Sequence, residues 1–433
     1  MESPAIQPIS TCSRRGFAWL LVVQFLGAAN DNVLKGVLIM AVAAGGKWSE
    51  SLGRGGQAWV WLALTVPFIL FSGYAGQLAD RHSKQRVTLS VKWIELGVAI
   101  IAMLGFCIQS LWVVLSALIL LATQSAFFGP AKYGMIPELV PSPRLSRANG
   151  LMNMTTNIAV LLGTYFGLGP IYQWYYPQSV ELADKAVHSE PVLWLPGIVI
   201  LLIAACGIAA TYGITRLRPM KKSLRLNWNP FESYWHSFLQ MRRERMVFIV
   251  FMWSSFYCVV SIVLLILPDY SKLLSITPVQ NGLLTAIMAL SIAIGCMGCG
   301  FMSRRRIVPI FIPFGAIGML GSFVALGLAP LSYWPIAAML ACAGLASGFF
   351  IIPLQAMIQL YSPENTRGRF LGTTNAFSFI AMSIGSVLFW VINGPIGVPA
   401  NRIFLFCAML AIIGTVILFA RMNRLAGDSR LLH

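Results

Sequence analysis

Charge is scarce in this sequence, and negative charge most of all. Only 10% of the 433 residues are charged, and 31 lysines and arginines stand against 14 aspartates and glutamates. Soluble domains carry about 25% charged residues, whereas 58% of this chain is hydrophobic and its mean hydropathy is +0.76. A disordered chain is excluded as well, because disorder goes with low hydrophobicity. The composition therefore predicts a protein that crosses a membrane several times.

Histidine is also rare, which argues against an enzyme. The four histidines lie in loops, in the central basic stretch and at the last position: His82, His188, His236 and His433. The sequence contains neither a His-x-x-x-x-Asp run nor the Gly-x-Ser-x-Gly turn of serine hydrolases. A membrane-embedded acyltransferase is therefore disfavoured, and we expect no catalytic residues.

The eight cysteines do not form a disulfide framework. Nearly all of them fall inside apolar stretches, as small residues of packed helices do. Cys296 and Cys299 have the spacing of a redox or zinc motif, but no second pair and no histidine lies near them in the sequence. Helix packing is the favoured explanation, and we expect no metal and no cofactor.

Twelve apolar stretches are long enough to span a membrane, which takes about 20 residues of helix. They are Phe17–Ala43, Gln57–Leu78, Leu89–Ile108, Leu111–Ala131, Ser146–Tyr172, Val192–Thr215, Met246–Leu267, Pro278–Phe301, Ile307–Leu328, Trp334–Leu360, Phe370–Ile392 and Ile403–Ala420. The first stretch has no cleavage-like site and is too long for a signal peptide, so we expect it to be a retained helix. The predicted fold is an all-α integral membrane protein with twelve transmembrane helices.

The net charge of +17 is explained by the loops rather than by nucleic-acid binding. With a cytoplasmic N-terminus, 24 of the 31 basic residues fall in cytoplasmic segments and 5 in external ones, while Lys35 and Lys92 lie within spans. Cytoplasmic loops of membrane proteins are enriched in lysine and arginine. We therefore expect both termini in the cytoplasm, and a basic face that suits membrane lipids and not nucleic acid.

The sequence divides into two halves that repeat each other. Six spans lie in residues 1–215 and six in residues 246–433, with a basic linker of residues 216–245 between them. In the linker, Asn229 and Pro230 followed by four aromatic residues predict an amphipathic helix on the cytoplasmic surface. Several matching elements share an offset of 222 positions: Phe127 and Phe128 with Phe349 and Phe350, Met135 with Met357, Ile136 with Ile358, Pro141 with Pro363, Arg147 with Arg369, Gly150 with Gly372, and Asn153 with Asn375. Two parallel six-helix bundles are typical of transporters.

The loop between the second and third spans carries a signature. It reads G-Q-L-A-D-R-H-S-K-Q-R from Gly76 to Arg86 and resembles the Gly-x-x-x-Asp-Arg/Lys-x-Gly-x-Arg/Lys-Arg/Lys loop of the major facilitator superfamily. An aspartate there can sit at a neighbouring helix N-terminus, bond to an arginine and latch one conformation. A solvated basic loop is the alternative. The predicted latch residues are Gly76, Asp80, Arg81, Lys84, Arg86 and Arg147.

Charged side chains inside spans are functional candidates, because burying them in a membrane is expensive. Asp31 and Lys35 lie four apart in the first span beside Asn32, and Lys92 and Glu95 lie three apart in the third. These spacings place each pair on one helix face. We expect Asp31, at mid-depth, to line a central cavity. Lys92 and Glu95 lie within two turns of the cytoplasmic end, so they either line the cavity or extend to the membrane surface.

Four motifs resemble the bacterial lysophospholipid transporter family within that superfamily. They are Phe25-Leu-x-x-x-x-Asp31-Asn32, Pro130-Ala-Lys-Tyr-Gly134, Ala148-Asn-Gly-Leu-Met152 and Gly348-Phe-Phe-x-x-Pro353-Leu. The resemblance implies the major facilitator fold and a flippase that moves lysophosphatidylethanolamine or lysophosphatidylglycerol from the outer to the inner leaflet of the bacterial inner membrane. It also implies a cytoplasmic acyltransferase/acyl-carrier-protein synthetase as the partner that re-acylates the lipid.

The resemblance also suggests where the substrate is handled. The family's charged cavity residues correspond to Asp31 and Lys132, whereas its acidic residue after Ala-Asn-Gly-Leu-Met is replaced by Asn153 and its arginine in the seventh span is missing. Lysines can meet a phosphate, and Asp31 either meets an ethanolamine ammonium or pairs with a lysine. Phe127, Phe128, Phe349 and Phe350 either line a tail path or simply pack. The predicted substrate site comprises Asp31, Asn32, Lys35, Lys92, Glu95, Lys132 and Asn153.

A proton-coupled exporter of small amphiphilic compounds is the second hypothesis. The fifth span contains Gly163-x-x-x-Gly167-Leu-Gly169-Pro170, which partly matches the motif of facilitator-superfamily antiporters. In this hypothesis Asp31 is the proton site. Close packing of helices through small residues would explain the same glycines.

Overall fold

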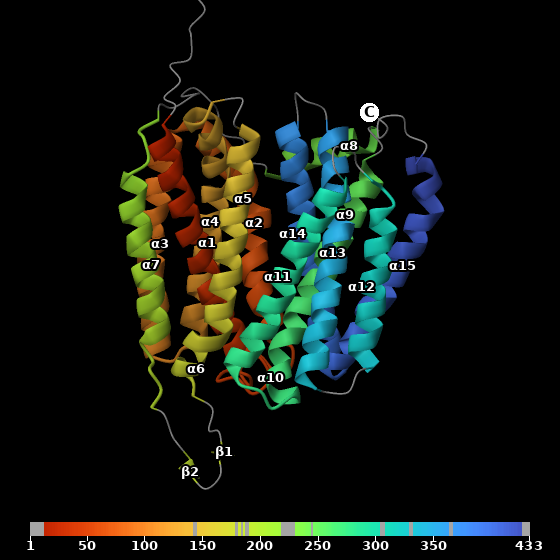
Figure 1. Ribbon diagram of the computed structural model, residues 1–433. Coiled ribbons are helices and arrows are strands. Elements are labelled where there is room, and N and C mark those ends of the chain that lie inside the picture. Colours follow the sequence, from red (N-terminus) through yellow and green to blue (C-terminus); the bar gives the residue numbers. More distant parts are fainter. Residues whose placement is uncertain are drawn as a thin grey trace, which may run out of the picture.

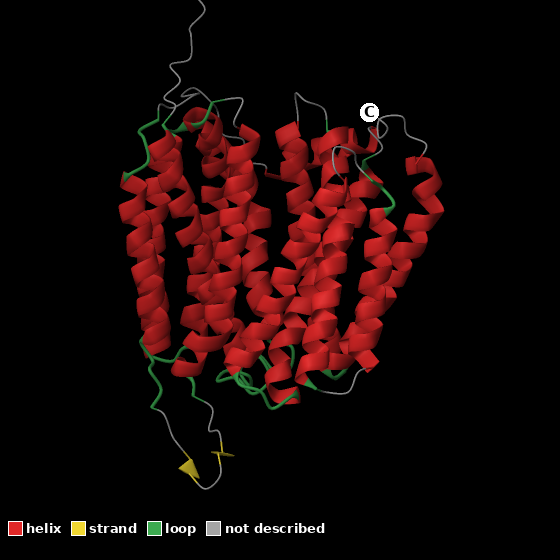
Figure 2. Cartoon of the chain, viewed as in Figure 1, coloured by secondary structure: helices red, strands yellow, loops and turns green. Residues whose placement is uncertain are grey.

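The chain forms a bundle of long, roughly parallel helices (Figures 1 and 2). The computed structural model describes residues 13–141, 145–177, 181–182, 185–186, 190–217, 230–243, 246–303, 308–328, 332–362 and 367–426. Within these ranges, ten helices are long and apolar enough to cross a membrane by themselves. Helices α2 and α5 run beside them over the height of the bundle (Figure 1), so the twelve predicted spans are confirmed as helices.

The helix bounds follow the predicted spans closely, and the helices extend beyond several of them. The helices are α1 (Arg14–Val42), α2 (Gln57–Arg81), α3 (Lys84–Cys107), α4 (Leu111–Leu139), α5 (Leu145–Phe166), α6 (Tyr172–Tyr175), α7 (Leu195–Tyr212), α8 (Pro230–Arg243), α9 (Val247–Ile266), α10 (Tyr270–Leu273), α11 (Pro278–Ser303), α12 (Phe311–Leu328), α13 (Tyr333–Tyr361), α14 (Arg367–Asn393) and α15 (Ala400–Ala426). Two strands of two residues each, β1 (Glu181–Leu182) and β2 (Lys185–Ala186), pair between α6 and α7, where the sequence predicted no regular structure.

Backbone bonding explains why these apolar stretches are helices. In a membrane the backbone must satisfy its own hydrogen bonds, and a helix does so within one segment. The fifth span shows how a proline is accommodated, because α5 continues through a π-helical segment, Gly167–Ile171, that contains Pro170. Wider backbone turns of this kind absorb the hydrogen bond that proline cannot donate.

The two sets of six spans have equivalent partners. We call α1 to α7 the first half and α9 to α15 the second half. The bounds of α4 and α13 differ by 222 positions at both ends, and α5 and α14 begin 222 positions apart. Helix contacts repeat in the same way: α1 packs on α5 and α9 on α14, and α3 packs on α7 and α12 on α15. Between the halves, α2 packs on α14 and α11 on α5.

One end of the bundle is held together by contacts between the halves. Buried Asp269, which follows α9, accepts hydrogen bonds from the backbone N–H of Ala44 (3.1 Å) and from Nε2 of Gln57 (3.1 Å). Gln57 also donates to the carbonyl oxygen of Leu265 (3.0 Å). Deeper in the bundle, the rings of Phe68 and Phe379 stack at 4.8 Å between centroids. The halves therefore close at the end where α6 and α10 lie (Figure 1).

The first turn of α1, the last turn of α15 and helix α8 all lie at the opposite end of the bundle (Figure 1). Helix α1 begins there and α15 ends there, as twelve crossings require (Figure 1). The predicted amphipathic helix is present as α8, which contacts α2, α9 and α14. Phe238 of α8 packs edge-on against Phe377 of α14, and Trp235 is exposed. The linker around α8, residues 218–229, lies outside the described residues, and its cytoplasmic location stays a prediction.

Candidate functional site

Polar and charged side chains gather inside the otherwise apolar first half. Helix α1 supplies three of them, α3 two and α4 two. We call this set the charged cluster: Asp31, Asn32, Lys35, Lys92, Glu95, Ser125 and Lys132. The positions that the sequence singled out on three different helices therefore meet in one region, and Ser125 is an addition that the sequence analysis missed.

Lys92 and Glu95 form an ion pair in the interior of the bundle. Nζ of Lys92 lies 2.6 Å from Oε2 of Glu95, and each side chain is only 1% exposed. Asn30, which is fully buried, donates from Nδ2 to the other carboxylate oxygen of Glu95 (2.9 Å). Lys92 also lies over the ring of Phe128, 5.4 Å from its centroid. Of the two alternatives left by the sequence, extension to the membrane surface is therefore wrong.

A glycine makes room for this ion pair. A Cβ atom on Gly27 of α1 would lie 2.7 Å from Nζ of Lys92. A Cβ atom on Gly207 of α7 would lie 3.6 Å from the same nitrogen. The lysine therefore lies between α1 and α7 at a place where α1 presents no side chain.

Asp31 holds one of its carboxylate oxygens free of hydrogen bonds. Oδ2 accepts a hydrogen bond from the hydroxyl of Ser125 on α4 (2.7 Å), whereas Oδ1 is buried and has no hydrogen-bond partner. The carboxylate interacts electrostatically with the ammonium groups of Lys35 and Lys132. Neither ammonium is within 4.0 Å of it, and no other lysine or arginine of the described residues is. Asp31 can therefore accept a hydrogen bond from a cationic ligand or from a proton donor.

Lys35 is bound by a neutral partner instead of the aspartate four residues before it. Its Nζ donates to Oδ1 of Asn32 (2.6 Å) and lies 5.0 Å from the centroid of the Trp61 ring. Asn32 in turn donates from Nδ2 to the carbonyl oxygen of Ala28 (2.7 Å). The i,i+4 spacing of Asp31 and Lys35 thus places them on one helix face without a direct ion pair, because Asn32 reaches the ammonium first.

Lys132 lies against two aromatic rings. Its Nζ lies 5.0 Å from the ring centroid of Tyr133 and 5.7 Å from that of Phe128. Among the described residues, no carboxylate lies within 4.0 Å of it. The hydroxyl of Tyr133 donates to Oδ1 of exposed Asn153 on α5 (3.4 Å). Asn153 is therefore near the edge of the cluster, and Lys132 is a cation with hydrogen-bond donors available for an anion.

The predicted latch is only partly visible in the described residues. The surroundings of Gly76 and the side chains of Asp80 and Arg147 lie outside them. Lys84 forms an ion pair with Glu138 at the end of α4, and exposed Arg86 points to the surface. The sequence analysis missed Glu138 as a partner.

A second glycine explains how Lys84 reaches across to α4. A Cβ atom on Gly134 would lie 2.6 Å from Cε of Lys84. Gly134, the glycine that ends the Pro-Ala-Lys-Tyr-Gly run, is thus the place where the side chain of Lys84 crosses α4. Gly134 itself was the sequence signal for this contact, because a glycine inside a helix often has a packing reason.

Other sequence features have structural explanations. A Cβ atom on Gly163 would lie 2.6 Å from the carbonyl oxygen of Ala29, and one on Gly167 2.6 Å from that of Val33, so the glycine motif of the fifth span allows α5 to pack closely on α1. Cys296 and Cys299 have free thiols. No group of metal-ligating side chains occurs in the described residues.

The paired phenylalanines make different contacts, and whether they line a tail path stays a prediction. Phe128 contributes a ring face to Lys92 and Lys132, whereas Phe127 packs on Phe71 with ring centroids 6.1 Å apart. In the second half, Phe349 packs on Phe311 at 5.6 Å. Phe128 therefore contacts the charged cluster, and the other three phenylalanines pack against aromatic rings.

Comparison with known proteins places the chain in a family. Residues 20–386 match the Major Facilitator Superfamily. The lysophospholipid transporter LplT of Photorhabdus laumondii subsp. laumondii is 26% identical over 370 residues, and that of Salmonella arizonae is 26% identical over 368 residues; these matches cover 81–82% of this chain and of each relative.

Solved structures show the same fold at low sequence identity. A bacterial homologue of the human lysosomal transporter Spinster, in an inward-facing and unoccupied conformation, has a TM-score of 0.67 and 16% identity over 94% of this chain and 96% of its own. A POT family transporter in complex with 5-aminolevulinic acid has a TM-score of 0.70 and 14% identity over 96% and 99%. The chain therefore belongs to the Major Facilitator Superfamily and is a multi-pass membrane transporter, not an enzyme.

Proposed function

We propose that this transporter is a flippase for lysophospholipids in the bacterial cytoplasmic membrane. It moves a lysophospholipid from the outer to the inner leaflet by alternating access of the two halves. The similarity to LplT transporters over 81–82% of both chains supports this substrate class. With both termini inside, the product reaches the cytoplasmic side, where a separate acyltransferase re-acylates it.

The charged cluster is the observation that carries the proposal. A lysophosphatidylethanolamine headgroup has a phosphate and an ammonium. Lys132 offers an ammonium with no carboxylate of the described residues within 4.0 Å, and Asp31 offers a carboxylate oxygen without a hydrogen-bond partner. One cation and one anion inside apolar helices suit a zwitterion better than they suit a wholly apolar compound, because each buried charge then gains a partner.

The ion pair of Lys92 and Glu95 has a different role in this proposal. Both charges are already satisfied by each other and by Asn30. They set the electrostatic potential around Asp31, and the hydrogen bond from Asn30 links Glu95 of α3 to α1. Lys35, bonded to the amide oxygen of Asn32, is the second cation that can turn to a phosphate.

Uptake of labelled lysophosphatidylethanolamine tests the proposal. In spheroplasts or proteoliposomes, Asp31→Asn and Lys132→Ala are expected to lower uptake by at least roughly tenfold, which corresponds to the loss of one charged hydrogen bond. Lys272→Ala, which removes an exposed lysine on α10, is the matched control and should transport normally. Equal uptake with and without the protein would exclude the proposed function.

Proton-coupled export of small amphiphiles is a second candidate. Its support is the unbonded, buried Oδ1 of Asp31, since a carboxylate with an open oxygen can bind a proton. Resistance to amphiphilic drugs on expression, lost on addition of an uncoupler, is the result that this candidate requires. If the protein instead transports lysophospholipid and gives no resistance, export is excluded.

A further inference from the structure

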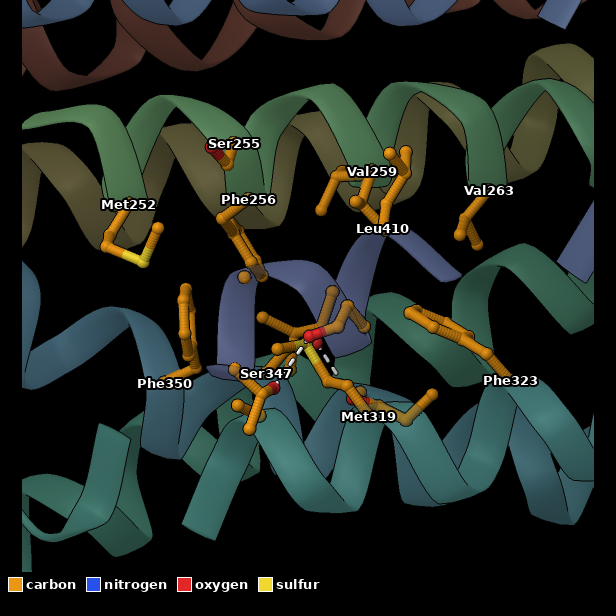
Figure 3. Close-up of a pocket in the computed structure, with 18 of the residues that line it drawn as sticks. Met252, Ser255, Phe256, Val259, Val263, Met319, Phe323, Ser347, Phe350 and Leu410 are labelled. Atoms are coloured by element: carbon orange, nitrogen blue, oxygen red, sulfur yellow. Dashed lines mark hydrogen bonds between the residues drawn. The ribbon is translucent and has the colours of Figure 1, made fainter. Parts of the chain in front are cut away.

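The second half contains an apolar pocket at its centre. The pocket is lined by α9, α11, α12, α13 and α15 (Figure 3), and its cavity volume is about 70 Å³. One water molecule needs about 10–15 Å³ of such space. Met252, Phe256, Met319, Phe323 and Phe350 are buried side chains of its wall. The apolar pocket is thus large enough for a few methylene groups at the end of a ligand.

The wall of the pocket offers nothing to a polar ligand. None of its lining residues is charged. Each of its hydroxyl groups donates to a backbone carbonyl of its own helix: Ser255 to Phe251 (2.8 Å), Ser347 to Ala343 (2.8 Å) and Thr415 to Ala411 (2.6 Å). A headgroup with charges would lose its hydration there without compensation. The only chemistry that the pocket fits is hydrocarbon.

The pocket occupies the place that the charged cluster occupies in the first half. Ser347 and Phe350, which line the pocket, are 222 positions after Ser125 and Phe128, which touch Asp31 and Lys92. Helices α9, α12 and α15 likewise take the places of α1, α3 and α7 in the helix contacts. The fold therefore presents two equivalent interior sites, one charged and one apolar.

The pocket is also built to adapt. Three methionines, Met252, Met288 and Met319, line it. Their unbranched thioether chains fill irregular space and rearrange easily. Protein interiors are otherwise close-packed, and an apolar space with flexible walls suits a flexible chain.

We propose that this apolar pocket binds an acyl chain, and that it takes the chain of the substrate whose headgroup lies at the charged cluster. This step rests on the proposed function. The same hydrocarbon could be supplied by a bilayer phospholipid, so the experiment must separate the two sources.

Filling the pocket tests the proposal. Gly414 of α15 lines the pocket, and a Cβ atom added to it meets nothing within 4 Å. The series Gly414→Ala, Val and Leu therefore puts increasing volume into the pocket. We expect Gly414→Leu to raise KM for long-chain lysophospholipid roughly tenfold, as when about two methylene groups lose their burial. KM for a short-chain analogue with the same headgroup should stay unchanged.

A matched control uses the same substitution outside the pocket. Gly321 of α12 is exposed, its added Cβ also meets nothing within 4 Å, and it does not line the pocket. Gly321→Leu should leave both KM values unchanged. A purified variant is compared only if it elutes as a single species and unfolds no lower than the unmodified protein. An equal rise in KM for both chain lengths, or no rise for either, would overturn the proposal.

Photolabelling of the unmodified protein identifies the lipid that supplies the acyl chain. It therefore does not depend on the folding of any variant. A lysophospholipid with a photoreactive group at the end of its chain should label peptides of α9, α13 and α15, and unlabelled lysophospholipid should abolish this labelling. Labelling by a photoreactive diacyl phospholipid that lysophospholipid does not displace would overturn the assignment to the substrate. If the protein transports lysophospholipid but labelling is confined to the first half, the assignment of the acyl chain to the pocket is overturned and the proposed function is not. Absence of transport with labelling intact would overturn the function and the link to the substrate together.

Discussion

In the first half, α1 and α3 carry Asp31, Lys35, Lys92 and Glu95 of the charged cluster; in the second half, α9 and α12 line a space bounded by methionine and phenylalanine. The two regions share helix contacts and an offset of 222 positions in their fourth helices. The scaffold is therefore common and the side chains are not. A repeat of this kind fixes where a site can form, whereas a few substitutions decide which part of an amphiphile the site accepts.

Removing one partner of the buried ion pair should change stability more than any other substitution that tests this comparison of the two halves. Glu95→Ala leaves the ammonium of Lys92 buried without a counter-charge, which costs about 3–5 kcal/mol when a buried pair is broken. The double variant Lys92→Met, Glu95→Leu makes the first half resemble the second, and replacing a whole pair with apolar residues is often neutral. Thermal unfolding in detergent should therefore show a large loss for the single variant and a small one for the double variant.

Two outcomes would contradict this view of the ion pair. If the double variant is as unstable as Glu95→Ala, the first half depends on the charges themselves and not on their mutual neutralisation. If Glu95→Ala is as stable as the unmodified protein, water or another residue compensates Lys92, and the pair does not hold α3 in place.

The equivalent serines allow a direct test of the two sites. Ser125 donates to the carboxylate of Asp31, whereas Ser347 donates only to a carbonyl of its own helix. A hydrogen bond to a charged group contributes about 1.5–3 kcal/mol, so Ser125→Ala should lower substrate affinity by roughly tenfold or more. Ser347→Ala should change affinity by less than about threefold, since its bond is neutral and local. Binding measured by quenching of tryptophan fluorescence checks both variants.

Two outcomes would contradict this comparison of the serines. If both alanine variants lose affinity equally, the two hydroxyl groups have the same role, and the headgroup is not restricted to the first half. If neither does, Asp31 is oriented by the helix alone, and Ser125 does not belong to the substrate site.

The sequence predicted the scaffold well, but of the residues that line the pocket of the second half it pointed only to Phe350, as one that either lines a tail path or packs. The length of the apolar stretches located all twelve spans, because a helix needs about 20 apolar residues to cross a membrane. Charge in a span located the residues of the cluster, because it is costly there. The pocket left no comparable signal, since Met252 and Phe256 look the same in sequence whether they fill a core or line a space.

Partners were harder to predict than positions. The spacing of Asp31 and Lys35 suggested one shared helix face. A hydrogen bond also depends on side-chain rotamers, and Lys35 donates to Asn32 instead of Asp31. Ser125 went unnoticed because one serine in a span is common. The repeat contained the signal, since Ser125 and Ser347 share the offset of 222 positions with the phenylalanine pairs.

The smallest expected effect comes from adding one methyl group to each site. In the first half, Gly27→Ala places its Cβ atom 2.7 Å from Nζ of Lys92, which must shift away from Glu95. Because a lysine end can move, we expect a loss of only about 1 kcal/mol, at the low end of overpacking costs. In the second half, Gly414→Ala meets nothing within 4 Å and should gain up to about 1 kcal/mol, because alanine favours a helix over glycine. Unfolding temperatures should thus move in opposite directions; a shift in the same direction would mean that the second site is as crowded as the first, and that its space is not available to a chain.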